Sequence, residues 1–375
     1  MSGPEIDESD IKTVVDVLRS GRLSLGAKIP EFEEAVCAYL GVQYAVAASS
    51  GTAALHLIVK SLGLGRGDEV LLPSFSFAAT ANVLLYEGVK PIFCDIENQT
   101  FNLDPQLIER KITGKTKAIL AVDVFGHPAD WHPIQEIAER HNLLLIDDSC
   151  EAFGAEYHGK KIGQFGNAAA FSFYPNKPIT TGEGGIVVTN NPEIARLARI
   201  LRNQGRSEMG SWLEHERLGF NYRMNELSAA LGVSQLRRIE PILQSRERVA
   251  ELYSEALRDV SWIRTPYVAE SVRMSWFAYV VTLEEGIDRN AIVAALEARQ
   301  IPTRCYFSPL HLQSYISGRA DCSADDLPVT ESVANRTVAL PFHNRLTEAE
   351  VKEVIGALKE AWKSISQNSG KVVNA

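Results

Sequence analysis

The sequence predicts an α/β fold built around a mostly parallel sheet, and three observations support this prediction. Short apolar runs rich in Val, Ile and Leu alternate with amphipathic stretches through the first two thirds of the 375-residue chain, which is the pattern of repeated βα units. These runs are apolar almost throughout, as expected for strands that are buried on both faces. The apolar fraction of 45% and the charged fraction of 23% are those of a globular protein with a large core.

The strands expected in this part follow in chain order. They are Glu69–Leu72, Pro91–Ile96, Ala118–Val124, Leu143–Asp148, Ala168–Phe173 and Gly185–Thr189. Between them, Thr52–Leu62, Ile134–His141 and Glu193–Asn203 each have one apolar face, so we expect helices there.

The pattern changes after Asn225, where a long helical stretch begins and is interrupted near Pro241. We therefore expect a large domain over residues 1–240 and a smaller α+β domain over residues 241–375. The elements expected in the smaller domain are a strand at Ser275–Thr282, a helix at Arg289–Arg299, a loop at Tyr306–Leu312 and a final helix at Thr347–Ser364.

Composition excludes several functions. Lys and Arg total 38 against 47 Asp and Glu, and the formal charge of -9 opposes general binding to nucleic acid. The five cysteines are widely spaced without a CxxC pair, so neither a disulfide framework nor a metal site is expected. The N-terminus does not have the layout of a signal peptide, and no apolar run is long enough to span a bilayer, so a cytoplasmic location is expected.

Two adjacent carboxylates, Asp147 and Asp148, end one of the predicted strands. Ligands of open α/β sheets bind at the carboxyl ends of the strands. Successive side chains of a strand point to opposite faces, so only one of the two should face such a site. Taken alone, the pair is also consistent with a solvated strand end or a helix cap.

A second feature is the segment FSFYPNKPITTGEGG at residues 171–185, in which a strand breaks at Pro175 and presents Lys177 before glycines lead into the next strand. Burial of a lysine at such a break lowers the pKa of its amine and makes it a Schiff-base nucleophile. An ordinary loop lysine beside a glycine turn is the alternative for this segment alone.

A third feature is the segment around Ser50, which can cap a helix whose first amides belong to Gly51 and Thr52. Free amides at a helix N-terminus bind phosphate, although many Ser-capped helices have no ligand. Together the three features describe a pyridoxal phosphate site, with a Schiff-base lysine, a carboxylate for the pyridine nitrogen and a helix N-terminus for the phosphate.

The order of the motifs resembles the DegT/DnrJ/EryC1/StrS aminotransferases, which are sugar aminotransferases of the pyridoxal phosphate-dependent transferase fold type I, also called aspartate-aminotransferase-like. The resemblance extends over nearly the whole chain. It is carried by SSGTAALHL at 49–57, LPSFSFAATANVL at 72–84, IDDSCEAFGAEY at 146–157, FSFYPNKPITTGEGG at 171–185, GFNYRMNELSAALG at 219–232 and RCYFSPLH at 304–311.

The resemblance implies the cofactor residues. Lys177 would form the Schiff base and move the proton of the reaction, and Asp148 would keep the pyridine nitrogen protonated. Phe77 would stack on the ring, and Glu151, where many members have Gln, would approach its 3′ oxygen. The phosphate would be bound by Gly51, Thr52 and Ser172, together with Asn221 from a neighbouring subunit.

The resemblance also implies the substrate side and a homodimer with shared sites. Arg223, Tyr306 and His311 match positions on the nucleotide-sugar side. Asp123 stands where the family commonly has His, which leaves the sugar contacts there open, and Asp147 stands where Glu is common. Lys160 and Lys161 could form a diphosphate clamp or a solvated hairpin, and we assign them no role.

The implied reaction is transfer of an amino group from glutamate to a nucleotide-linked 3-keto or 4-keto deoxysugar, which would give an amino sugar for a surface glycan or an antibiotic. An aminocyclitol- or aminoshikimate-type enzyme would share every cofactor residue and differ only at positions such as Asp123, Tyr306 and His311. A sugar dehydratase of the family would carry His in place of Lys177. A non-catalytic regulator of the same fold would not need both Lys177 and Asp148.

Overall fold

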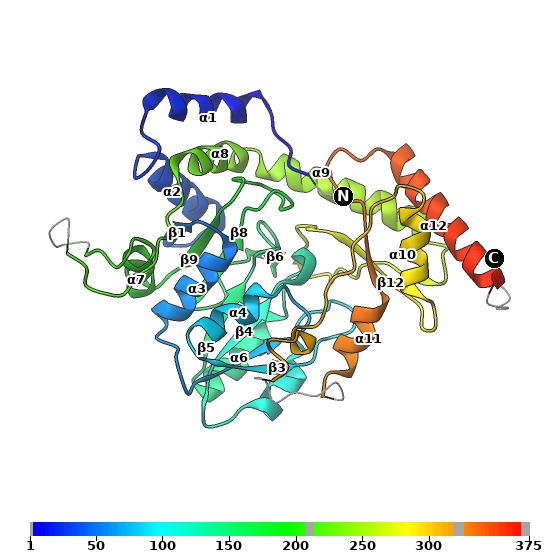
Figure 1. Cartoon of the computed structure of the whole chain (residues 1–375), viewed down its shortest axis with the longest axis horizontal. Helices are drawn as coiled ribbons and strands as arrows, with labels where there is room; N and C mark the ends of the chain where they lie inside the picture. The colour runs from blue at the N-terminus through cyan, green and yellow to red at the C-terminus, as the bar shows by residue number, and fades with distance from the viewer. Residues whose placement is uncertain (1–2, 208–213, 319–325, 369–375) are drawn as a thin grey trace.

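The computed structural model describes residues 3–207, 214–318 and 326–368 and has a seven-stranded sheet at its centre (Figure 1). The strand order is β1-β9-β8-β5-β4-β2-β3. The strands are β1 (Tyr44–Ala48), β2 (Glu69–Pro73), β3 (Lys90–Cys94), β4 (Thr116–Val122), β5 (Leu144–Asp148), β8 (Ala168–Ser172) and β9 (Gly185–Thr189). Strand β9 pairs antiparallel with β1 and β8, and all other pairs in this sheet are parallel. The predicted α/β class with a mostly parallel sheet is therefore confirmed.

The six predicted strands are all present, with ends that differ from the prediction by at most two residues. Strand β1 lies outside the predicted set. Its sequence, YAVAA, is short and rich in alanine, which has low β propensity. Its register is fixed by pairing with β9, a long-range contact that local sequence does not encode.

Helices cover both faces of the sheet. The predicted helices are present as α3 (Gly51–Ser61), α6 (Trp131–His141) and α7 (Pro192–Arg202). Alternate residues of β1 show the two faces, because Val46 packs in one buried apolar cluster and Ala47 in the other. Additional helices at the N-terminal side are α1 (Glu8–Ser20), α2 (Lys28–Leu40), α4 (Ala79–Tyr86) and α5 (Pro105–Ile108).

The predicted interruption near Pro241 separates two helices, α8 (Glu226–Leu236) and α9 (Ile239–Leu257). Pro241 lies in the first turn of α9, where its missing N–H costs no helical hydrogen bond. Figure 1 shows α1 lying along α8, and Asp10 of α1 accepts hydrogen bonds from Gln235 (2.7 Å) and Arg238 (2.6 Å).

The C-terminal part contains a small three-stranded sheet and lies to one side of the large sheet (Figure 1). Its strands and helices are β10 (Ile263–Arg264), β12 (Tyr279–Leu283), β13 (Thr337–Leu340), α10 (Arg289–Glu297), α11 (Pro328–Arg336) and α12 (Glu348–Asn368). A third sheet joins β6 (Glu156–Tyr157) and β7 (Lys160–Lys161) to β11 (Val272–Arg273). Since one apolar cluster continues from the large sheet into the C-terminal sheet, the division at residue 240 stays a prediction.

Candidate active site

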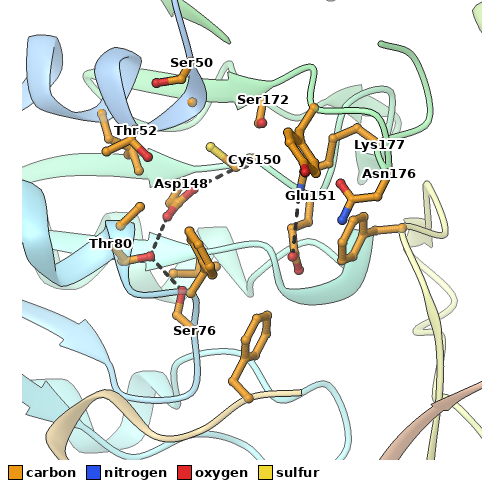
Figure 2. Close-up of a pocket in the computed structure, with 18 of the residues that line it drawn as sticks. Ser50, Thr52, Ser76, Thr80, Asp148, Cys150, Glu151, Ser172, Asn176 and Lys177 are labelled. Carbon is orange, nitrogen blue, oxygen red and sulfur yellow. Dashed lines mark hydrogen bonds and ion pairs between the residues drawn. The ribbon is translucent and has the colours of Figure 1, made fainter. Parts of the chain in front are cut away.

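A cavity of about 370 Å³ lies at the carboxyl edge of the large sheet. Because β4, β5 and β8 run parallel, their last residues Val122, Asp148 and Ser172 reach the same edge and line the cavity. Eight of the predicted site residues line it: Gly51, Thr52, Phe77, Asp148, Glu151, Ser172, Lys177 and Tyr306. Figure 2 labels Thr52, Asp148, Glu151, Ser172 and Lys177 among them.

Lys177 lies in the loop after β8, and its side chain is 11% exposed. Its Nζ is 3.7 Å from Oε1 of Glu151 and 4.0 Å from the centre of the Phe277 ring. The Lys177 N–H also donates to the carbonyl of Tyr174 at 2.9 Å, which fixes the turn that presents the side chain. The amine is thus held inside the cavity by a carboxylate and an aromatic face.

Asp148 ends β5 with its side chain in the cavity. Its Oδ2 accepts a hydrogen bond from the Thr80 hydroxyl at 2.7 Å, and Oδ1 accepts from the Cys150 N–H at 3.3 Å. Thr80 in turn is 2.7 Å from the hydroxyl of Ser76 (Figure 2). Burial raises the pKa of Asp148, and the bonds from Thr80 and Cys150 act in the opposite direction. These two bonds hold the carboxylate in place, and it can also accept a hydrogen bond from a ligand in the cavity.

Glu151 follows β5 on the same side of the sheet. Its Oε2 accepts from the Phe125 N–H at 2.9 Å, while Oε1 faces Lys177. Burial raises the pKa of Glu151, and the charge of Lys177 opposes that rise. The Glu151 carboxyl group can therefore hold or release a proton beside the amine of Lys177.

The N-terminus of α3 forms the other end of the cavity. As predicted, Ser50 caps the helix, with its Oγ accepting from the Ala53 N–H at 3.1 Å. A Cβ placed on Gly51 would lie 2.8 Å from Cβ of Ser172 and 3.0 Å from Sγ of Cys150. Only glycine therefore leaves the helix amides open between α3 and the end of β8, where an anion can approach them.

Phe77 precedes α4 and is 65% exposed, although it lines the cavity. A core phenylalanine would be buried, so Phe77 is not a core residue. A ring left exposed beside polar groups suits stacking on a flat ligand.

Three of the predicted residues do not line this cavity. Asn221 is exposed, and Arg223 donates to Oδ1 of Asn203 at 3.0 Å. His311 is buried, with Nδ1 2.7 Å from the Ser74 hydroxyl and Nε2 3.0 Å from Oε1 of Glu331. The roles predicted for these residues on the phosphate and substrate sides stay predictions.

Asp123 is not on the substrate side of the cavity, so that expectation is wrong. Its carboxylate is fully buried and accepts hydrogen bonds from the Ala129 N–H at 2.7 Å and from the Ser149 hydroxyl at 2.7 Å. Lys160 and Lys161 form strand β7, and Lys161 pairs with Glu156 and Glu240. These pairs agree with the hairpin alternative.

Several cavity residues were not identified from sequence. Thr80, which orients Asp148, lies in the motif at residues 72–84 and one helical turn beyond Phe77, so the motif contained a signal for it. Cys150 also lies in a motif, at residues 146–157, but a lone cysteine has many structural uses. Phe277 lies outside all six motifs, and a single aromatic in an apolar run is most often a core residue. Burial raises the pKa of the Cys150 thiol well above its usual value.

The fold and the cavity define a pyridoxal phosphate-dependent aminotransferase of fold type I. The model of the DegT/DnrJ/EryC1/StrS aminotransferase family matches residues 4–359, and the chain belongs to this family. The expected family, fold type and cofactor are thereby confirmed.

Relatives of known name agree with this assignment. The chain is 40% identical to a GDP-perosamine synthase of Caulobacter vibrioides over 96% of this chain and 97% of the relative. It is 35% identical to a UDP-2-acetamido-2-deoxy-3-oxo-D-glucuronate aminotransferase of Pseudomonas aeruginosa, over 91% and 93% of the two chains. A putative sugar aminotransferase of Streptococcus pneumoniae, solved in a PLP-form, superimposes with a TM-score of 0.92 at 29% identity, covering 97% of this chain and 98% of the other.

The residues present fit pyridoxal phosphate. The open cradle at Gly51 suits the phosphate, Asp148 can pair with the pyridine nitrogen, and the amine of Lys177 reaches the same cavity. Within residues 3–207, 214–318 and 326–368, no helix is long and apolar enough to cross a membrane. Four cysteines of the described part are free thiols, and Cys322 lies outside it.

Proposed function

We propose that the chain transfers the amino group of glutamate to the ketone of a nucleotide-linked deoxyhexose. The observation that carries the proposal is the amine of Lys177, buried in one cavity with Asp148 and the open N-terminus of α3. The GDP-linked and UDP-linked sugars in the names of the relatives support a nucleotide sugar as the acceptor. The product would be an amino sugar.

When bound, pyridoxal phosphate supplies a ring that withdraws electrons from the carbon that loses a proton. Asp148 would hold the pyridine nitrogen protonated, because a carboxylate within hydrogen-bond reach favours the charged form. Lys177 would bind the cofactor covalently and, once released by the incoming amine, move the proton from the α-carbon of glutamate. The same amine would return a proton to the sugar carbon in the second half-reaction. Because 2-oxoglutarate would leave while the amino group stays in the site for the sugar, the kinetics would be ping-pong.

The other residues would bind and orient. Gly51, Thr52 and Ser172 would hold the phosphate at the N-terminus of α3, where the helix dipole favours an anion. Phe77 would cover one face of the ring. Glu151 would lie against the 3′ oxygen and exchange a proton with Lys177, 3.7 Å away.

We further propose that two copies of the chain complete each site. Among the described residues that line the cavity, Lys177 is the only cation, while Asp148, Glu151 and Glu183 are acidic. A phosphate and the carboxylates of glutamate need more positive and hydrogen-bonding groups than this, and Asn221 and Arg223 of a partner subunit would supply them. The apolar side chains of Leu218 (84% exposed) and Tyr86 (58% exposed) are consistent with a surface that a partner subunit covers.

The test of the reaction is the absorbance spectrum of the purified protein before and after glutamate. The wild type should have a near-visible cofactor band that shifts with glutamate, and Lys177→Ala should lose the band of the lysine-bound cofactor. Lys161→Ala is the matched control, because Lys161 is a partly buried, paired lysine outside the cavity. GDP-linked and UDP-linked keto-sugars should then restore the original band. If the absorbance band does not change when glutamate is added, glutamate is not the donor. If the protein takes up no cofactor, the proposal is contradicted.

The shared site is tested by mixing two inactive variants. Lys177→Ala lacks the amine, and Asn221→Glu places a negative charge where the partner's phosphate would lie. If the sites are shared, a mixed dimer has one intact site and regains activity after subunit exchange. Absence of any recovery, with exchange verified by native mass spectrometry, contradicts the shared site.

A further inference from the structure

The two carboxyl groups at the end of β5 have different surroundings. Asp148 faces the cavity, whereas Asp147 is fully buried on the other face, next to Asp123 and Ser149. The Ser149 hydroxyl contacts both of these buried carboxyl groups, Oδ2 of Asp123 at 2.7 Å and Oδ1 of Asp147. None of these three residues lines the cavity.

A count of hydrogens constrains this cluster. A serine hydroxyl has one hydrogen, and an ionised carboxylate can only accept. Ser149 can therefore donate to one carboxylate, and its second contact is a hydrogen bond only if the other carboxyl group is protonated and donates to it. Two buried anions sharing one hydroxyl would leave one of them unsatisfied at high cost.

The remaining contacts decide which group is protonated. Oδ1 of Asp123 accepts from the Ala129 N–H at 2.7 Å and from the Trp131 ring N–H at 3.2 Å. These donors stabilise a charge on Asp123. Asp147 has no comparable donor, and its Oδ2 has no hydrogen-bond partner within the described part of the chain.

We infer that Asp147 is protonated and donates a hydrogen bond to the Ser149 hydroxyl, which donates a hydrogen bond to the ionised carboxylate of Asp123. We call this chain, Asp147–Ser149–Asp123, the buried relay. Its negative charge lies on Asp123, at the end of the relay that has backbone and indole donors. Asp147 and Ser149 are positioning residues, since they touch neither cofactor nor substrate.

The pKa shifts agree in direction. Burial raises the pKa of Asp147 well above its usual value, and the charge of Asp123 raises it further. Burial raises the pKa of Asp123 to about 6, against the lowering by its bonds from Ala129 and Ser149. Asp148 is the other charged group that acts on Asp147. Above pH ~6, Asp123 is thus the ionised member of the pair.

The relay has a consequence for the cofactor site, and this step rests on the proposed role of Asp148. A charge on Asp147 would lie one residue away from Asp148 and would oppose its ionisation. Keeping Asp147 neutral leaves Asp148 as the one anion at the end of β5, free to pair with the pyridine nitrogen.

Infrared difference spectra of the holoenzyme test the protonation directly. Asp147→Asn minus wild type, near neutral pH, should show loss of the carbonyl stretch of a protonated carboxyl group and no loss of a carboxylate band. Loss of a carboxylate band instead overturns the inference. This readout does not depend on transamination, so it separates failure of the relay from failure of the proposed function.

Paired amide variants provide the second test. An amide at 147 donates to Ser149 as the acid does, so Asp147→Asn should keep Tm within ~2 °C. In Asp123→Asn the amide nitrogen faces Ser149, whose hydrogen must turn to Asp147, so Tm should fall by ~5 °C or more. Equal losses in the two variants, or a larger loss in Asp147→Asn, overturn the inference.

The change of the free energy of unfolding with pH in the same variants provides a third test. The pKa of Asp123 is raised in the folded protein, so its contribution to stability is present below the unfolded pKa of ~3.9 and is lost as pH rises through about 6. The part of this decrease that belongs to Asp123 should persist in Asp147→Asn and be lost in Asp123→Asn, where the raised pKa of Asp147 still contributes a decrease of the same sign. If Asp123→Asn does not fold, the infrared result on Asp147→Asn decides.

Discussion

The two walls of the cavity are built differently. The wall at the sheet consists of polar groups at the ends of regular elements, such as Asp148 at the end of β5 and Gly51 at the start of α3. The opposite wall comes from the C-terminal part and presents the aromatic rings of Phe277, Tyr306 and Phe307, which lie outside its helices and strands.

The difference indicates a division of labour. Strand pairing and helix caps hold the sheet wall to a small range of positions, which suits the fixed geometry of a cofactor. Loops tolerate changes in sequence, so the aromatic wall can be reshaped for different sugars while the cofactor wall stays the same. Mutations in the sheet wall should thus affect the reaction itself, and those in the aromatic wall should affect the choice of substrate.

The largest effect is expected for Asp148→Asn. An amide at this position cannot stabilise a protonated pyridine nitrogen as a carboxylate does, so kcat should fall on the order of 10²–10³-fold. The measurement is the rate of the glutamate half-reaction, followed by absorbance in single turnover.

Asp104→Asn is the matched control for this change. Asp104 caps α5 by accepting from the Gln106 N–H, and Asn caps helices as well as Asp does. The control should keep the wild-type rate. If Asp148→Asn were as fast as the wild type in the glutamate half-reaction, Asp148 would have no role in the reaction.

More residues of the sheet wall than of the aromatic wall were predicted from sequence. Strand ends, breaks and helix caps have local signatures, and these indicated Lys177, Gly51 and the Asp147–Asp148 pair. The family resemblance then selected Asp148 from the pair. The aromatic wall forms when residues distant in sequence meet, as Phe277 meets Lys177, and no local pattern encodes that contact. Asp123 was misplaced for the same reason, since its position depends on Ser149 and Trp131.

A smaller effect is expected for Gly51→Ala. The new methyl group would lie 2.8 Å from Cβ of Ser172, so the phosphate cradle must widen at a cost of ~1–3 kcal/mol. That cost corresponds to a cofactor affinity about 5- to 150-fold weaker, measured by titrating the apoprotein. Gly65→Ala, which meets no atom within 4 Å, should bind the cofactor as the wild type does.

Tyr306→Phe tests the aromatic wall. Burial raises the pKa of Tyr306, and the charge of Glu151 raises it further, so the hydroxyl keeps its hydrogen and can donate to a sugar oxygen. Loss of one such bond should lower kcat/KM for the keto-sugar by about 10-fold, while the glutamate half-reaction stays within about 2-fold. Tyr267→Phe, outside this cavity, is the control. Equal losses in both half-reactions would contradict the division between the walls.

The smallest effect on catalysis is expected for His311→Gln. Because a carboxylate only accepts, Nε2 of His311 donates to Glu331, and its other nitrogen contacts Ser74 directly after β2. These bonds connect the C-terminal part to the sheet and lie outside the cavity, so Tm should fall by ~2–4 °C while KM for the keto-sugar changes by less than about 2-fold. Glu331→Gln should lower Tm in the same way. A raised KM with unchanged Tm would instead assign His311 to the substrate, as the family resemblance implies, and would extend the aromatic wall to the short 3-10 helix at Leu310–Leu312.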